Sequence, residues 1–349
     1  MSKPFEPRGV WPALATPFTD DGRIDFAAYE RLTRFVVAEG VTGVVPCGTT
    51  GESPTLSWEE HDRLVVSAIE WVGDACGVLA GAGSNNTQEA IRGTDDARKH
   101  GASAALLVDC YYNGPSSLEL RREYYERVLK AVPEIPIVPY IIPGRTGCAL
   151  GAEDLAMLHL ADPARVPAVK QATGDLDRMR YDRQLCGASL AIMSGDDDMT
   201  LDMMNDPGIQ ASGVISVMAN LVPRAMSEMV AARTEGDIGR AGEIVGKIGP
   251  LLRVVGVRVH GVRTLPDGRE LQVEDKFRNP VPLKAMMTGL GMIGGYCRRP
   301  LGPMSEPAIA VCRDALRAVY EVAPEYLRPI GEHFGVDVAA RIESDAHWR

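Results

Sequence analysis

The sequence has no cysteine pair at the spacing of a zinc site, no long run of one charge and no long apolar run. Lys and Arg number 37 against 47 Asp and Glu, a net charge of −10 without a basic patch, which disfavours nucleic acid as a partner. No stretch reaches the roughly 18 apolar residues of a membrane span, and the first residues lack the apolar core of a signal peptide. An odd number of scattered cysteines predicts reduced thiols. We therefore expect a soluble, cytoplasmic protein. The seven cysteines are Cys47, Cys76, Cys110, Cys148, Cys186, Cys297 and Cys312.

Histidine is also scarce. The six histidines include no HxxxH pair, so a histidine-based metal site or a Ser-His-Asp triad has little support. We expect His61 and His159 to lie on helices. The acidic triplet Asp196–Asp198 has two interpretations. It is a candidate Mg²⁺ site, although such a run more often caps a helix. No metal or other cofactor is expected.

What the sequence does contain is a repeated alternation of short apolar runs and amphipathic stretches. Helical spacing is clear in residues 25–40, 57–72 and 117–132. Eight strands with helices between them predict a closed (β/α)8 barrel, a TIM barrel, within 349 residues. An open doubly wound sheet is the alternative, but GAGSNN after the third strand has Asn86 where a dinucleotide fingerprint needs glycine. The predicted strands are 9–16, 41–47, 77–83, 102–109, 135–142, 166–172, 190–195 and 213–219.

The pattern changes after about residue 225. Alternating valines around Pro266-Asp267-Gly268 predict a β-hairpin near residues 251–276, and helices resume from Pro282. The predicted division is a barrel of residues 1–225 and a C-terminal helical region of residues 226–349 that carries the hairpin.

In such barrels the chemistry lies at the carboxyl ends of the strands. Lys170 closes the sixth strand, where desolvation disfavours an ammonium ion and makes the free amine available to attack a carbonyl and form a Schiff base. Tyr140 ends the neighbouring fifth strand, and its phenol can relay protons. The alternatives are a lysine that extends from the rim or pairs with Asp175, and a tyrosine that is only structural.

Two further loops carry polar groups. GTTGE after the second strand places Thr49 and Thr50 between glycines, which suits a carboxylate held by hydroxyl and amide donors, or else is a simple turn into a helix. Arg145 follows Tyr140 and can bind a second carboxylate through its planar guanidinium, or can simply be solvated.

Taken in order, GTTGES, DCYYNGPS, PYIIPGRTG, VKQATGD, SGDD, GVISVMAN and NPVPLKAMMTGLG resemble the dihydrodipicolinate synthase and N-acetylneuraminate lyase family. The resemblance covers residues 9 to 250 and resumes at residue 279. It implies a class I pyruvate-dependent lyase. Arg145 favours members that use L-aspartate 4-semialdehyde, in lysine and diaminopimelate biosynthesis, over sugar-acid lyases.

The resemblance also implies roles for individual residues. Lys170 would form the imine with pyruvate, and Thr49, Thr50 and Gly51 would surround the pyruvate carboxylate, with main-chain contacts from Ile215. Tyr140 would relay protons through Thr49 to Tyr112, which reaches in from a neighbouring subunit and so requires at least a dimer. Arg145 would bind the carboxylate of the second substrate. A homotetramer is expected, together with a possible feedback site for lysine. The residues of that site are Ser53, His61, Asn85, Glu89 and Tyr111, near a variable position occupied by Trp58.

Three departures from the family pattern leave alternatives open. Ile141 replaces the usual asparagine, the hairpin is an insertion, and the carboxyl terminus extends past the usual end. The aldehyde acceptor is therefore open: the imine chemistry would also serve a sugar-acid or hydroxy-oxo-acid aldolase. A Mg²⁺-dependent aldolase and a non-catalytic homologue are the remaining alternatives.

Overall fold

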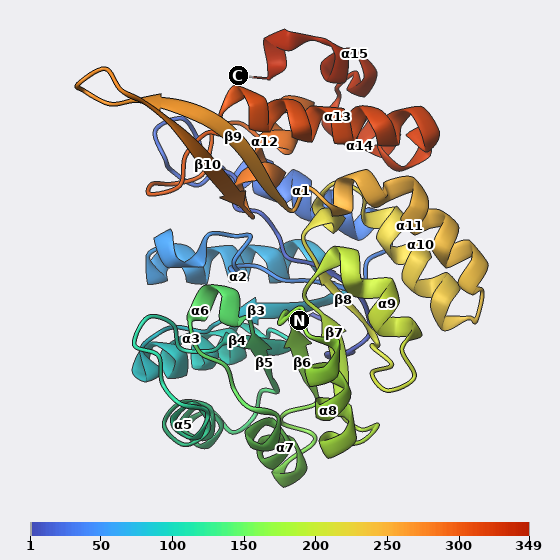
Figure 1. Ribbon diagram of the computed structural model, residues 1–349. Coiled ribbons are helices and arrows are strands. Elements are labelled where there is room, and N and C mark those ends of the chain that lie inside the picture. Colours follow the sequence, from blue (N-terminus) through green and yellow to red (C-terminus); the bar gives the residue numbers. More distant parts are fainter. Residues whose placement is uncertain (1, 349) are drawn as a thin grey trace.

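The computed structural model describes residues 2–348 and contains a barrel of eight parallel strands surrounded by helices (Figure 1). The strand order is β1-β8-β7-β6-β5-β4-β3-β2, so each strand lies beside its neighbour in the chain, as short right-handed βα units require. The strands are β1 (Gly9–Pro12), β2 (Gly43–Val44), β3 (Gly77–Gly81), β4 (Ala104–Val108), β5 (Ile137–Ile141), β6 (Ala168–Gln171), β7 (Ala191–Ser194) and β8 (Gly213–Ser216).

The helices between the strands form the outer layer, and several begin with a side-chain cap. Asp25, Asn86 and Asp175 each accept a hydrogen bond from the first turn of the helix that follows, which satisfies a backbone donor without an intrahelical partner. These helices are α1 (Phe26–Ala38), α2 (Trp58–Val72), α3 (Thr87–His100), α4 (Ser117–Glu119), α5 (Glu126–Ala131), α6 (Pro143–Thr146), α7 (Ala152–Ala161), α8 (Leu176–Cys186), α9 (Thr200–Asn205) and α10 (Pro223–Thr234).

The predicted barrel and all eight predicted strands are confirmed. The observed strands are shorter, because the last residues of several predicted runs turn out of the ladder to begin loops; Cys47, for example, has a φ of 57°. The barrel closes between its first two strands through a bridge from Ala13 to Val45. On the other side of β1, Asn220 connects the turn after β8 to the end of β1, since its amide accepts from the Ala15 N–H and donates to the Ala13 carbonyl at 2.8 Å.

The predicted helix over 117–132 is interrupted. A π-helical segment, η2 (Leu120–Tyr125), lies between α4 and α5. It buries two consecutive tyrosines, Tyr124 and Tyr125. The Tyr124 hydroxyl donates to the Val108 carbonyl on β4, and the Tyr125 hydroxyl donates to the carboxylate of Asp109, directly after β4, at 2.6 Å. We infer that these hydrogen bonds set the course of the backbone here, which therefore departs from a regular α-helix.

Side chains fill the barrel interior. Trp11, Leu79, Val138, Met193 and Ile215 belong to one buried cluster in which Tyr140 also takes part. Gly43 makes room for the largest of them, because a Cβ at this position would lie 2.1 Å from the Trp11 ring. Large side chains thus fill the interior of the barrel beneath the carboxyl ends of the strands.

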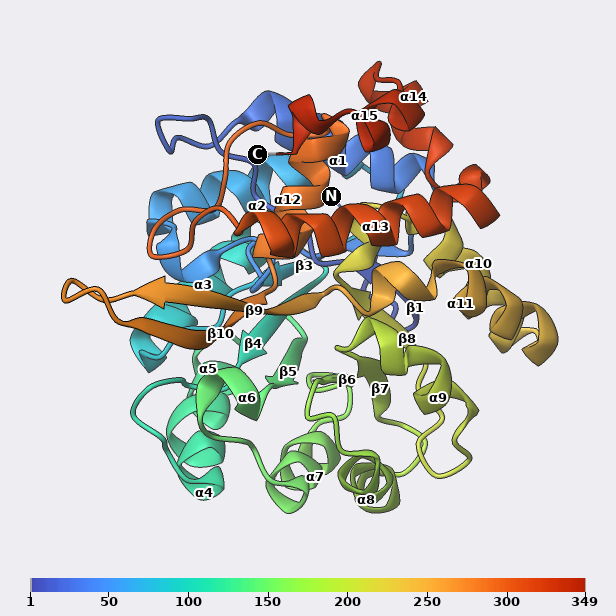
Figure 2. The same ribbon diagram turned by 45° about the horizontal axis from the view of Figure 1, so that its top comes forward.

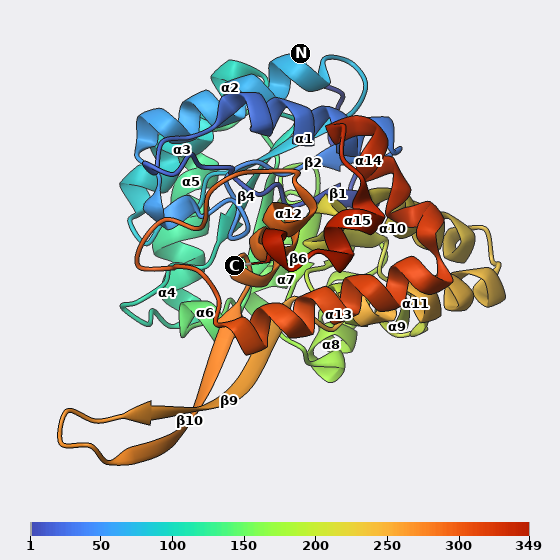
Figure 3. The ribbon, with the colours of Figure 1, turned by 90° about the horizontal axis from the view of Figure 1, so that it is seen from above.

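The C-terminal region packs along one side of the barrel and carries a hairpin that projects from the molecule (Figures 2 and 3). The predicted hairpin is confirmed, as β9 (Gly256–Thr264) paired antiparallel with β10 (Glu270–Arg278). The predicted division near residue 225 falls in the first turn of α10 and stays a proposal. No helix in residues 2–348 has the length and apolarity needed to cross a membrane. The remaining helices are α11 (Ile238–Leu252), α12 (Val281–Leu290), α13 (Glu306–Val322), α14 (Arg328–Phe334) and α15 (Val338–Glu343), with short turns at η1 (Ser53–Thr55), η3 (Asp197–Met199), η4 (Met218–Asn220), η5 (Pro324–Tyr326) and η6 (Asp345–His347).

Candidate active site

Lys170 lies inside the mouth of the barrel. Its residue is 4% exposed, and its Nζ stands 4.1 Å from the centroid of the Tyr140 ring. The two residues are direct neighbours in the β5–β6 register. The alternative pairing with Asp175 is wrong, because Asp175 accepts from the Arg178 N–H as the cap of α8. A buried amine against an aromatic face, with no carboxylate bound to it among the described residues, is suited to attack a carbonyl carbon.

A cavity of about 220 Å³ opens beside Tyr140. Thr49 and Arg145 line it together with Tyr140, so predicted site residues from β5, from the turn after it and from the loop after β2 meet at one hollow. The cavity also takes in Ser53 and Tyr111 from the predicted feedback site. Lys170 adjoins it through the Tyr140 ring. The cavity therefore combines a phenol, a hydroxyl and a guanidinium, and the Lys170 amine lies on the Tyr140 ring beside it.

Asn279, for which the sequence indicated no role, connects two of these loops. Its Nδ2 donates to the Thr50 hydroxyl at 3.0 Å, and its carbonyl accepts from the Arg145 guanidinium at 2.8 Å. Part of the Arg145 side chain is exposed, yet its guanidinium lies in a concave rim where desolvation lowers its pKa and repulsion from Arg278 adds to the effect. The motif NPVPLK was the only signal for Asn279.

The remaining predicted site residues lie apart from the cavity lining. Gly51 accepts from the buried Thr16 hydroxyl at 2.7 Å, and Ile215 packs inside the barrel cluster with Tyr140. Tyr112 points away from its own chain, with 91% of the residue exposed and a φ of 79°. An exposed aromatic residue in a backbone conformation that favours glycine is costly for an isolated chain.

The acidic triplet after β7 neither caps its own helix nor forms a metal cluster. Asp197 is buried and accepts from the Ser216 hydroxyl and from the N–H groups of Val217 and Met218. The predicted capping role is therefore wrong, since Asp197 holds the turn after β8 instead. Burial raises the pKa of Asp196 to about 6, with repulsion from Asp198 as the next cause. Within the described residues, no three or more His, Cys, Asp or Glu side chains converge as metal ligands.

Gly195 permits the close packing around Lys170. A Cβ at this position would lie 2.7 Å from the Ala172 Cβ and 3.1 Å from the Lys170 Cε. We expect Gly195→Ala to displace the amine and to lower kcat about tenfold, because small misplacements of reacting groups are costly. Steady-state kinetics check this, with Gly144→Ala as the control, since nothing lies within 4 Å of the Cβ that it adds. Equal kcat values for both variants would contradict the packing argument.

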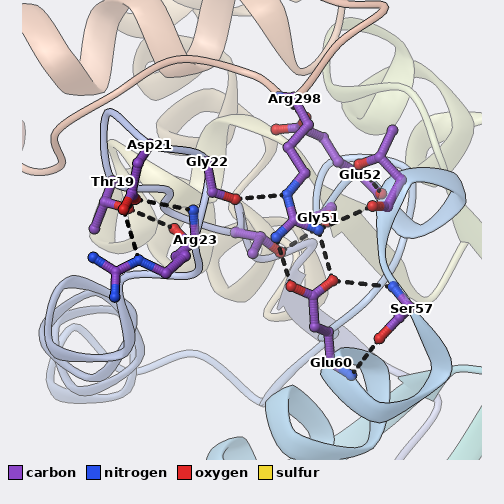
Figure 4. Close-up of polar contacts among 11 residues, drawn as sticks. Thr19, Asp21, Gly22, Arg23, Gly51, Glu52, Ser57, Glu60 and Arg298 are labelled. Atoms are coloured by element: carbon purple, nitrogen blue, oxygen red, sulfur yellow. Dashed lines mark hydrogen bonds and ion pairs between the residues drawn. The ribbon is translucent and has the colours of Figure 1, made fainter.

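A buried ion pair anchors the GTTGE loop to the C-terminal region. The Lys284 ammonium donates to Glu52 at 2.7 Å and to the Thr16 carbonyl at 2.9 Å. Glu52 also accepts from the Arg298 N–H at 2.8 Å, and the Arg298 guanidinium binds Glu60, which lowers the pKa of that carboxyl (Figure 4). Three segments distant in sequence thus fix the loop that carries Thr49 and Thr50.

Three of the five predicted feedback residues line two adjoining hollows. Ser53 and Tyr111 line the central cavity, while Tyr111 and Asn85 line a neighbouring depression of about 390 Å³. His61 lies on α2, as expected, and its Nε2 is 2.9 Å from the Ser53 hydroxyl. Glu89 accepts from the Ser84 hydroxyl at 2.6 Å. Like His61, His159 lies on a helix, α7.

Burial lowers the pKa of His61 to about 4 from the ordinary 6.5. Because its folded pKa lies below its unfolded one, this residue contributes stability above pH 6.5 that is lost as the pH falls toward 4. Between pH 7 and pH 5 the loss is about 2 kcal/mol. Denaturant unfolding of the wild type and His61→Gln at both pH values checks this.

The pH dependence of stability must be compared between the wild type and His61→Gln because another buried group also titrates in this range. Burial raises the pKa of Asp109 to about 7. A carboxyl of this kind acts in the opposite sense, stabilising the fold as the pH falls. The pH response of His61→Gln should therefore differ from that of the wild type by about 2 kcal/mol. Identical responses would show that His61 titrates normally.

Comparisons with known proteins give one consistent family of relatives. The model of the dihydrodipicolinate synthetase family matches residues 6–319. A 4-hydroxy-tetrahydrodipicolinate synthase of Methanothrix thermoacetophila is 40% identical over 310 residues, 88% of this chain and 96% of the relative. A dihydrodipicolinate synthase of Acinetobacter baumannii, solved with pyruvate, has 33% identity and a TM-score of 0.79, covering 90% of this chain and 99% of that one. The enzyme of Cyanidioschyzon merolae, solved with lysine bound, has 30% identity and a TM-score of 0.79, covering 89% and 98%.

Proposed function

The chain belongs to the dihydrodipicolinate synthetase family, and we propose that it condenses pyruvate with L-aspartate 4-semialdehyde to give 4-hydroxy-tetrahydrodipicolinate. The observation that carries the proposal is the buried Lys170 amine against Tyr140, beside a cavity lined by Thr49 and Arg145. The reaction makes the chain a lyase of lysine and diaminopimelate biosynthesis.

The first half of the reaction takes place on Lys170. Its free amine adds to the C2 carbonyl of pyruvate, and loss of water gives an iminium ion. The iminium withdraws electrons so that a proton leaves the methyl carbon and an enamine forms. Tyr140 lies against the amine and exchanges protons with the intermediates, through Thr49. Thr49 and Thr50 hold the carboxylate of pyruvate, with Gly51 and main-chain groups at Ile215 beside it.

The second half joins the two substrates. The enamine carbon attacks the aldehyde carbon, and the amino group of the second substrate then displaces Lys170 by transimination, which closes the ring and frees the lysine. Arg145 binds the carboxylate of this substrate through its planar guanidinium. Its hydrogen bond to the Asn279 carbonyl, 2.8 Å long, supports that orientation. The chemistry needs no metal, because the iminium itself is the electron sink.

Tyr112 supports an oligomer. Its exposed ring and its positive φ suit a residue that is inserted into a neighbouring subunit, where it would extend the proton relay from Tyr140 and Thr49. We propose that the working unit is at least a dimer and that two dimers form a homotetramer, in the cytoplasm.

We also propose that lysine binds at Ser53, His61, Asn85, Glu89 and Tyr111. The Cyanidioschyzon merolae relative, solved with lysine bound, supports lysine as a ligand. Tyr111 belongs to both hollows, so an occupant of the depression would contact a residue of the catalytic cavity. An assay in which millimolar lysine has no effect would reject the proposal.

The acceptor is tested by assaying the purified protein with pyruvate and a panel of aldehydes. Turnover with L-aspartate 4-semialdehyde well above that with sugar or hydroxy-oxo-acid aldehydes is expected. The reverse preference would favour the second candidate, an aldolase of the same family, for which Ile141 in place of the family's asparagine is the supporting observation.

A further inference from the structure

The second strand of the hairpin, β10, ends directly at the loops that carry the candidate site residues. Arg278, the last residue of β10, donates to the Gly144 carbonyl at 2.9 Å, in the turn that carries Arg145. The next residue, Asn279, binds both Arg145 and Thr50. The base of the hairpin is therefore part of the wall around the site, while its tip extends away from the barrel (Figure 3).

A second hollow, of about 480 Å³, lies between the base of the hairpin and the segment 300–303. Lys276 and Arg278 line it from β10. Thr49 and Arg145 line both this hollow and the smaller cavity beside Tyr140. The two spaces thus adjoin, and the larger is an antechamber to the smaller.

The cations of this antechamber have no carboxylate partner. Within residues 2–348, Arg145, Lys276 and Arg278 form no ion pair. The nearby acids are already engaged, since Glu52 is bound to Lys284 and Glu274 to Arg258. Repulsion from Arg258, and next from Arg278, lowers the pKa of the Lys276 ammonium.

This arrangement is unfavourable for the hairpin alone. Lys276 stands directly opposite Arg258 in the β9–β10 register, and like charges at such positions destabilise a two-stranded ladder. The chain as a whole carries a net charge of −10, which repels anionic substrates. A local excess of positive charge at the mouth of an otherwise acidic protein attracts them.

We propose that Lys276 and Arg278, together with Arg145, form an anion-binding antechamber that captures the carboxylate of incoming pyruvate before it reaches Lys170. The inference rests on the proposed function, in which pyruvate is the first substrate. Lys276 and Arg278 are positioning residues, because they act on the arrival of the substrate and not on the reacting atoms. The site raises the local concentration of the anion and leaves the chemical steps unchanged.

The test is the dependence of imine formation on pyruvate concentration, with borohydride as the trap and no aldehyde present. Lys276→Gln should raise the KM for pyruvate roughly threefold and Lys276→Glu roughly tenfold at low ionic strength, with the maximal rate unchanged. The differences should disappear in 1 M salt, where the screening length is about 3 Å. Arg269→Glu, the same charge change near the hairpin tip, is the matched control and should behave as the wild type.

The outcomes distinguish a failure of the proposed function from a failure of the antechamber proposal. If wild-type Lys170 is not trapped by pyruvate, the proposed function fails. If it is trapped but the Lys276 variants keep the wild-type KM, the antechamber is refuted. A lowered maximal rate, or a KM increase that persists in 1 M salt, would also overturn it, because either result assigns Lys276 a structural role.

Discussion

Lys170→Arg should be at least a thousandfold slower in turnover than the wild type, the scale of loss seen when a catalytic nucleophile is removed. Arginine keeps the positive charge and much of the length of lysine, but a guanidinium is never deprotonated in proteins and cannot form the imine. Steady-state assay with pyruvate and L-aspartate 4-semialdehyde measures the effect. Lys170→Ala should lose activity to the same extent.

Correct folding of these variants must be shown separately, because Lys170 is buried. Circular dichroism and the unfolding midpoint of Lys170→Ala should resemble those of the wild type, since a smaller neutral side chain removes a buried amine. Lys247→Arg, on the exposed face of α11 where the lysine lies 3.8 Å from Glu325, is the control for a lysine-to-arginine change. Retained turnover in a folded Lys170→Ala protein would eliminate the imine mechanism.

Glu52→Gln should destabilise the fold by about 3 to 5 kcal/mol, the usual consequence of removing one member of a buried ion pair. The Lys284 ammonium, 2% exposed, would lose its charged partner and keep only neutral ones, including the carbonyls of Thr16 and Tyr296 at 2.9 and 3.2 Å. Lys284→Met should have a similar effect, because it leaves the Glu52 carboxylate uncompensated. Denaturant unfolding at one fixed protein concentration measures both variants.

The double variant Glu52→Gln/Lys284→Met provides the control. Removing both charges eliminates the unpaired ion, so the double variant should lose less stability than the sum of the two single changes. Arg34→Gln, which removes the exposed pair with Glu30 at 2.8 Å, should change stability by less than about 1 kcal/mol. Strict additivity of the two buried changes would show that the pair is not coupled.

The barrel was predictable because its signal is local and repeated. Each apolar run is followed within a few residues by a turn and an amphipathic helix, and eight repetitions leave few other folds. The hairpin was predictable for the same reason, from alternating valines and Pro266-Asp267-Gly268. Lys170 and Tyr140 meet because they end neighbouring parallel strands, and the predicted strand order alone makes them neighbours.

The supporting contacts were not predictable, because they join distant parts of the chain. Asn279 lies 229 residues from Thr50, and Lys284 lies 232 residues from Glu52. Neither pair has a periodic pattern, and both depend on how the C-terminal region packs on the barrel. Asp197 was misjudged for a similar reason, since its hydrogen-bond donors come from β8 and the turn after it rather than from its own helix.

The most direct measurement is reduction with borohydride in the presence of pyruvate, followed by mass spectrometry of the peptides. The account predicts one pyruvyl adduct, on Lys170, and none on the buried Lys284 or on surface lysines such as Lys247. A protein that remains unlabelled, or an adduct on any other lysine, would contradict the claim that Lys170 is the amine that captures the keto acid.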